Sequence, residues 1–147
     1  MGAGLVLRLR PNERFLVNGV VLENGDRRTR LVVKTENAHI LRLRDAMHPD
    51  DANTPVKRLY YIAQLAVAGE ASDMDAQTQL LQGLQDLGEA LTKTEGKSDI
   101  DEAISLVQER SFYQAMRVLK KLIPFEANLL NPTTATEEAS EHIPEGV

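Results

Sequence analysis

The first third of the chain alternates between apolar and polar residues, a pattern typical of half-buried β-strands. In GLVLRLR, residues 4–10, three leucines occupy every second position, and a valine and two arginines alternate with them. Successive side chains of a strand point to opposite faces, so the leucines share one face. Further short apolar runs follow in RFLV, VVLE, RTRLVVK and HILRLR. Four or five such strands predict a small antiparallel sheet or barrel.

Two Asn-Gly dipeptides interrupt these runs. Asn18-Gly19 and Asn24-Gly25 each lie between two apolar segments. Asparagine and glycine both tolerate positive φ, which makes this dipeptide the strongest short-range signal for a tight hairpin. The sequence therefore predicts a hairpin turn at each dipeptide.

From residue 54 the apolar positions change to helical spacing. Thr54 is a predicted N-cap, Pro55 suits the first helical position, and Gly69 is a plausible C-cap. On this helix we expect Leu59, Tyr60 and Ala63 to face inward, and we expect Lys57, Arg58 and Gln64 to lie largely on other faces.

Two or three further helices are expected downstream. One begins at Ser72 or Asp73, another near Asp99, and a break around residues 109–111 divides or kinks the last apolar stretch, which Pro124 is expected to end. The residues from Asn131 onward are acidic and poor in apolar side chains, which is typical of a disordered tail.

The prediction is therefore an α+β protein. We expect a small antiparallel β-domain at residues 1–46, an α-helical domain of three to four helices at 54–127, and a flexible acidic tail at 128–147. The apolar helix stripes suit a core, although some of that surface is free to form an oligomer or partner interface.

Charge divides the chain in the same way. Residues 1–58 hold eleven Lys/Arg and seven Asp/Glu, a net of +4, and residues 59–147 hold six and fifteen, a net of -9. Such asymmetry suggests a nucleic-acid-binding face on the basic half, and the competing interpretation is an ordinary uneven surface.

The arginines of the basic half follow the strand alternation. Guanidinium groups bind phosphates bidentately and stack on bases, so an arginine-rich sheet suits RNA. A solvated polar face is the alternative, because the segment has one aromatic residue, Phe15. The predicted RNA-binding residues are Arg8, Arg10, Arg27, Arg28, Arg30, Arg42, Arg44, Lys57 and Arg58.

No catalytic or metal-binding motif is apparent. The chain has no cysteine, and its three histidines are isolated from one another. EGKS, residues 95–98, lacks the first glycine of a phosphate loop, because position 91 is a leucine. We expect no enzyme activity, cofactor or metal. No signal peptide and no apolar run of about 20 residues is present, so a cytoplasmic protein without membrane contact is expected.

Four stretches together resemble the FlbT family of flagellar regulators: ERFLVNGVVLENGDRR, ILRLRDAM, ANTPVKRLYYIAQL and FYQAMRVLKKLIPFEA. The resemblance runs from about residue 5 to 127. The matching motif positions are Asn18, Gly19, Val21, Asn24, Gly25, Asp26 and Arg27, then Ile40, Leu41, Arg42 and Asp45, then Thr54, Pro55, Arg58, Tyr60 and Gln64.

The resemblance implies a cytoplasmic post-transcriptional regulator that acts on the 5′ leader of flagellin messenger RNA and changes its translation or lifetime. It also implies a small helical partner, FlaF. Family members act as repressors or activators, so the direction does not carry over. The alternative is a protein-interaction adaptor in flagellin assembly or secretion that contacts flagellin and no RNA.

Two further interpretations concern the β-domain. Asp26 and Arg27 have an alternative structural role as an ion pair at their turn. A β-domain of about 45 residues is near the lower limit for independent stability, so a homodimer or higher homo-oligomer is expected.

Overall fold

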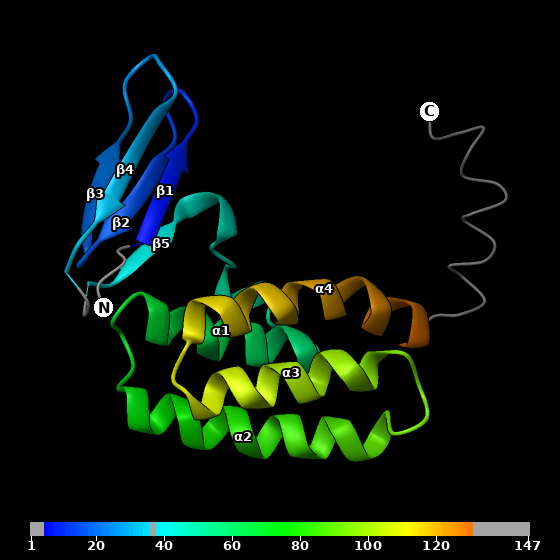
Figure 1. The fold of residues 1–147 in the computed structure, drawn as a ribbon. Coiled ribbons are helices and arrows are strands. Elements are labelled where there is room, and N and C mark those ends of the chain that lie inside the picture. Colours follow the sequence, from blue (N-terminus) through cyan, green and yellow to red (C-terminus); the bar gives the residue numbers. More distant parts are fainter. Residues whose placement is uncertain (1–4, 36–37, 131–147) are drawn as a thin grey trace, which may run out of the picture.

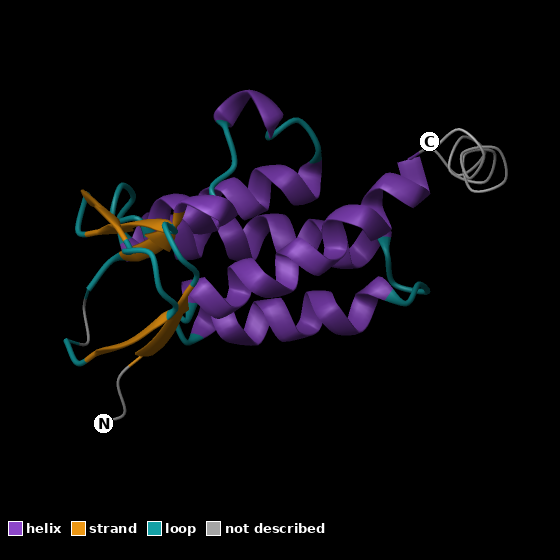
Figure 2. Ribbon diagram, turned by 90° about the horizontal axis from the view of Figure 1, so that it is seen from above, coloured by secondary structure: helices purple, strands orange, loops and turns teal. Residues whose placement is uncertain are grey.

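The fold is α+β, as predicted, and in the described part of the chain five strands precede four α-helices. A computed structural model describes residues 5–35 and 38–130. The strands form a small upright sandwich at one end of the helical bundle (Figure 1). The same arrangement is visible from above, where the strands lie beyond the ends of the helices (Figure 2).

Two sheets make up the sandwich. β1 (Leu5–Leu9) pairs antiparallel with β4 (Thr29–Val33), and β2 (Arg14–Val17) lies between β3 (Val20–Glu23) and β5 (Ile40–Arg42). The sandwich core consists of the buried side chains of Leu7, Leu9, Phe15 and Ile40. Each sheet thus buries one face against the other.

One of the two predicted hairpin turns is confirmed. Asn18 and Gly19 have φ of 51° and 84°, and they join the paired strands β2 and β3. The other prediction is wrong, because Asn24-Gly25 connects β3 in one sheet to β4 in the other. Asn24 secures this crossing through its side-chain amide, which donates to the carbonyls of Arg10 at 2.7 Å and Arg27 at 2.8 Å.

β5 is shorter than its alternation predicted. The strand ends at Arg42, and a 3₁₀ turn, η1 (Leu43–Asp45), follows. All three residues of β5 are buried, because one face meets the sandwich core while Leu41 on the other face joins the helical core. A strand covered on both faces has no solvent side, so alternation along it could not reveal an exposed face.

The helices form a four-membered bundle: α1 (Pro55–Val67), α2 (Asp73–Ala90), α3 (Gly96–Gln108) and α4 (Phe112–Leu130). A second 3₁₀ turn, η2 (Pro49–Asp51), precedes them. Each helix packs against the next, and α4 returns to pack against α1. The largest fully buried side chains are Leu80, Leu84, Ile100, Met116, Leu119, Leu122, Val56 and Val107.

The predicted start and break signals of the helices are confirmed at several helix ends. Thr54 caps α1 by accepting a hydrogen bond from Lys57 N at 3.3 Å, and Pro55 opens the helix. Ser72 caps α2 by accepting from Asp75 N at 3.1 Å. The predicted break is confirmed between α3 and α4, where Arg110 adopts a φ of 61°.

Two helix ends differ from the prediction. α3 begins at Gly96 rather than near Asp99, because its first turn lies against α4: a Cβ at Gly96 would meet Phe125 Cε2 at 2.7 Å. α4 continues through Pro124 to Leu130, since flanking buried residues such as Leu122 hold the helix despite the lost hydrogen bond. Residues 128–130 of the expected tail are therefore helical, and the rest lies outside the described residues.

Gln64 also departs from its predicted placement. Its side chain is buried, accepts a hydrogen bond from Met47 N at 2.6 Å and donates to Met47 O at 3.1 Å. The Gln64 amide pairs with both the backbone N–H and the backbone C=O of Met47. Its burial therefore leaves no polar group of this pair without a hydrogen-bond partner. The loop before α1 is thereby attached to the bundle.

Glu126 of α4 supplies a second cap for α1 across the bundle. It is buried, its Oε2 accepts from Val56 N at 2.9 Å, and Thr54 Oγ1 donates to its Oε1. A carboxylate at a helix N-terminus satisfies free N–H groups and interacts favourably with the helix dipole.

Replacing Glu126 by alanine is expected to lower the free energy of unfolding by about 1.5–3 kcal/mol, because two donors lose a charged acceptor. Urea denaturation monitored by circular dichroism measures the change. The control is Glu89→Ala, on the exposed surface of α2, with an expected change under about 0.5 kcal/mol. Equal, small changes in both variants would contradict the capping role.

Candidate nucleic-acid interface

Seven arginines of the basic half fall into two groups in the structure, and the second group also includes cations of α4. The first is the sheet-face cluster, on the outer side of the β1–β4 sheet and the loop before β4. Arg8 of β1 is the cross-strand partner of Arg30 of β4, and both are exposed. Arg27 and Arg28 are exposed in the preceding loop. The cluster consists of Arg8, Arg27, Arg28 and Arg30.

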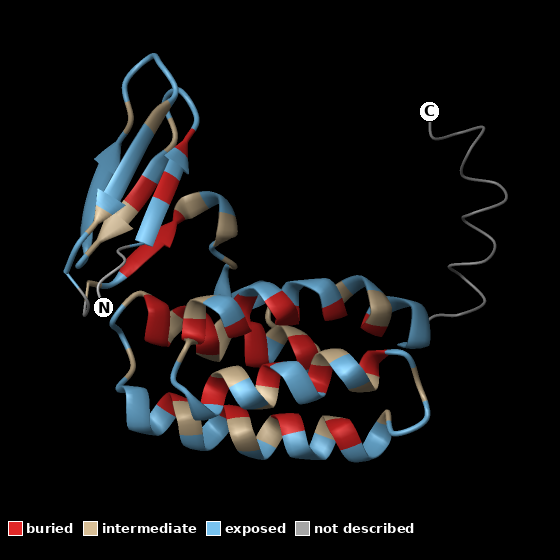
Figure 3. Cartoon of the chain, viewed as in Figure 1, coloured by how far each residue is buried: buried red, intermediate tan, exposed pale blue. Residues whose placement is uncertain are grey.

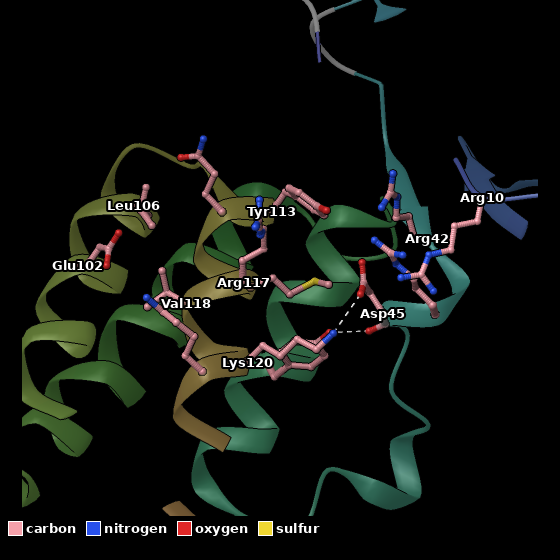
Figure 4. A pocket seen from close by; sticks show the side chains of 14 residues that line it. Arg10, Arg42, Asp45, Glu102, Leu106, Tyr113, Arg117, Val118 and Lys120 are labelled. Atoms are coloured by element: carbon pink, nitrogen blue, oxygen red, sulfur yellow. Dashed lines mark hydrogen bonds and ion pairs between the residues drawn. The ribbon is translucent and has the colours of Figure 1, made fainter. Parts of the chain in front are cut away.

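The second group lines the junction cleft, a cavity of about 950 Å³ between the sandwich and the helices. Figure 4 shows Arg10 and Arg42 on one side of it and side chains of α4, among them Arg117 and Lys120, on the other. Six cations and two anions line it, a net of +4. The charged residues are Arg10, Arg42, Arg44, Arg117, Lys120, Lys121, Asp45 and Glu102.

Glu13 anchors the strand side of the cleft. Its Oε1 accepts a hydrogen bond from Arg10 N at 2.9 Å, and its Oε2 lies 3.4 Å from Arg42 Nε and 3.8 Å from Arg44 Nε. Arg42 is buried and also donates from Nη2 to the carbonyl of Arg8. Arg42 therefore joins β5 to β1, while Arg10 and Arg44 remain exposed at the cleft.

The two groups are continuous with one another. Arg10 belongs to the junction cleft and Arg27 to the sheet-face cluster, and their carbonyls accept hydrogen bonds from the same Asn24 amide nitrogen. A basic path therefore runs from the loop before β4 to α4. The arginines beside Asn24-Gly25 therefore lie on the same surface as the cations of the helical half.

The structure separates the predicted residues among different surroundings. Arg8 is the cross-strand partner of Arg30, and Arg42 reaches the Arg8 carbonyl from the other sheet, because β1 and β5 belong to different sheets. Lys57 is half-buried and Arg58 exposed on α1, and neither lines the cleft. Among the described residues no ion pair joins Asp26 to Arg27.

Sequence reasoning missed the contribution of α4. Arg117, Lys120 and Lys121 are exposed and line the cleft. Their spacing of i, i+3 and i+4 places them on one helix face. That spacing was a usable signal, but the net charge of -9 in this half of the chain concealed it.

Aromatic and acidic groups complete the cleft. Tyr113 of α4 is half-exposed within it, and Tyr60 of α1 donates a hydrogen bond from its hydroxyl to the carbonyl of Asp45 at 2.6 Å. Lys120 Nζ lies 3.2 Å from Asp45 Oδ1. A partly exposed tyrosine among cations can stack on a base while the cations contact phosphates.

Burial, assisted by the charge of Asp45 and by Tyr113, raises the pKa of Tyr60 from 10.0 to about 12. We expect one of the three tyrosines to form tyrosinate only near pH 12, and Tyr60→Phe to remove that step from a spectrophotometric titration. The unfolded chain releases this proton near pH 10, so stability contributed by Tyr60 falls as pH rises from about 10 to 12. A titration of the wild type that is complete well below pH 12 would contradict this environment.

The described residues contain neither a metal-ion site nor a membrane-spanning helix. In residues 5–35 and 38–130, no group of three or more His, Asp or Glu residues is arranged to hold a metal ion. Within the same part of the chain, no helix has the length and apolar character required to cross a membrane.

The family model described as "Flagellar protein FlbT" matches residues 5–130. The chain belongs to the FlbT family. It is 34% identical over 138 residues to a "Probable flagellum biosynthesis repressor protein FlbT 1" of Bradyrhizobium diazoefficiens, covering 93% of this chain and 92% of that one.

Other members of the family agree with this assignment. A "Probable flagellum biosynthesis repressor protein FlbT" of Caulobacter sp. is 34% identical, with 83% of this chain and 92% of that one covered. A "Flagellum biosynthesis repressor protein FlbT" of Caulobacter vibrioides is 30% identical, with coverages of 83% and 86%. No solved structure matches. These names support a regulatory role in flagellar synthesis, within a family of regulators that is not a known enzyme family.

Proposed function

We propose that the chain is a cytoplasmic post-transcriptional regulator that binds the 5′ leader of flagellin messenger RNA and modulates its translation or stability. The observation that carries this proposal is the junction cleft. Cations from the strands and from α4 meet there at a net charge of +4, within a chain whose net charge is -5. Such local concentration of positive charge suits a polyanion.

The composition of the cleft favours single-stranded RNA. Its guanidinium groups, at Arg10, Arg44 and Arg117, can contact phosphates, and the half-exposed ring of Tyr113 can stack on an unpaired base. The sheet-face cluster extends the same path through Arg27. The proposed RNA-binding surface therefore includes both groups, with Arg42 supporting it from within.

An anisotropy titration tests the proposal. A labelled flagellin leader RNA is expected to bind the purified protein, and a scrambled RNA of equal length to bind more weakly. Equal affinity for both would indicate charge alone. No binding to either at low salt would overturn the proposal and favour the adaptor alternative, in which the chain contacts flagellin or the small helical partner FlaF.

A further inference from the structure

Exposed aliphatic side chains gather on the sandwich. All four residues of β3 are exposed, and Figure 3 shows β3 and most of β4 in the colour of exposed residues. Exposed apolar patches of this kind on a soluble protein usually mark an interaction site. The seven side chains, each 40–58% exposed, are Leu5, Val6, Val20, Val21, Leu22, Leu31 and Val32.

β3 also has an open backbone edge. Among the described residues it pairs with β2 alone. Backbone groups of an antiparallel strand alternate in direction, so every second residue of β3 directs its N–H and C=O away from β2. An apolar edge with free backbone groups is a template for another strand.

The interior of the sandwich is open along this edge. Val20 and Leu22 oppose Val17 and Phe15, so all four share the face turned to the β1–β4 sheet. Val20 is nevertheless 57% exposed and Leu22 41%. Among the described residues, the buried apolar core between the sheets consists of four side chains. So small a core gains stability from additional apolar cover.

We propose that β3 pairs antiparallel with β3 of a second copy of this chain, across a twofold axis that passes beside Val21, so that the two copies of Val21 lie opposite each other. The arrangement is isologous, so a single strand satisfies both sides of the interface. It converts the three-stranded sheet of each copy into half of a continuous six-stranded sheet. It also brings the open interiors of the two sandwiches together.

Area and charge favour a second copy at β3. Val20, Val21 and Leu22 of β3, together with Leu31 on the inner face of β4, expose on the order of 300 Å² in each copy, which is part of the roughly 800 Å² per partner of a standard interface. The single charge in β3 is Glu23, which pairs with Arg14 of the same chain at 3.0 Å. Antiparallel pairing holds the two Glu23 carboxylates apart, whereas pairing through β4 would bring together the cations around Arg30.

Cross-linking tests the position of the interface. The chain has no cysteine, so Val21→Cys introduces a single thiol at an exposed position of β3, and Met74→Cys introduces one at the 66% exposed Met74 of α2 as a matched control. Mild oxidation at micromolar concentration is expected to yield a covalent dimer of twice 16.3 kDa from Val21→Cys and chiefly monomer from Met74→Cys. Equal cross-linking of the two variants, or none in Val21→Cys, would overturn the proposed interface.

Sedimentation equilibrium of the uncross-linked full chain provides a second readout. The wild type is expected at twice 16.3 kDa and Val21→Lys at 16.3 kDa, because a lysine on the edge places two charges in the interface. Circular dichroism checks that the variant is folded. A monomeric wild type at micromolar concentration, or a folded Val21→Lys that is still a dimer, would overturn the proposal.

Discussion

Replacing Arg10, Arg117 and Lys121 together by serine is expected to weaken binding to flagellin leader RNA by roughly 100- to 1,000-fold at low salt. All three are exposed at the junction cleft, from both of its walls. Each replacement of a cation by serine removes about one charge-assisted hydrogen bond to a phosphate. Such bonds are about twice as strong as hydrogen bonds between neutral groups. Fluorescence anisotropy with the leader RNA measures the loss.

A variant with the same change in net charge provides the control. Lys34, Lys93 and Lys97 lie outside both the cleft and the sheet-face cluster. Their joint replacement by serine is expected to reduce affinity only a few-fold, through the general field of the protein. If the two triple variants lose affinity equally, the cleft is not where the RNA binds.

Replacing Leu59 by alanine is expected to lower the free energy of unfolding by about 2–5 kcal/mol, since it leaves a cavity in the helical core. Leu59 is buried in α1 and fills the space left by a glycine of α2: a Cβ at Gly83 would lie 2.5 Å from Leu59 Cδ2. Truncation therefore loosens the contact between the two helices. Urea denaturation gives the change in unfolding free energy.

Arg58→Ala, one residue earlier in the same helix, is the matched control. Arg58 is exposed, and its replacement is expected to cost under about 0.5 kcal/mol. If Arg58→Ala destabilises the protein as much as Leu59→Ala, the inner and outer faces assigned to α1 are wrong.

Local chemistry explains which parts of the fold were predictable. Thr54, Ser72 and Asn18-Gly19 act through neighbouring backbone groups, so their sequence signals sufficed. Asn24-Gly25 carries the same signal as Asn18-Gly19, but strand pairing elsewhere in the sandwich determines its conformation. A dipeptide does not encode which strand its flanking residues will pair with.

The candidate site was only partly predictable for a related reason. Alternation correctly placed Arg8 on the outer face of β1, opposite Leu7 and Leu9. It could not show that Arg42 would turn into the sandwich, because that depends on β1 lying above β5. Nor could it show that α4 would bring its cations to the strands, because helix packing joins parts of the chain far apart in sequence.

Salt dependence of RNA affinity tests the central claim most directly. Each phosphate neutralised on a single strand contributes about -0.7 to the slope of log affinity against log salt. If Arg10, Arg117 and Lys121 contact phosphates, the slope of the triple serine variant should be shallower than that of the wild type by about 2. Parallel lines for the two proteins would contradict the account, because the cleft would then release no counterions on binding.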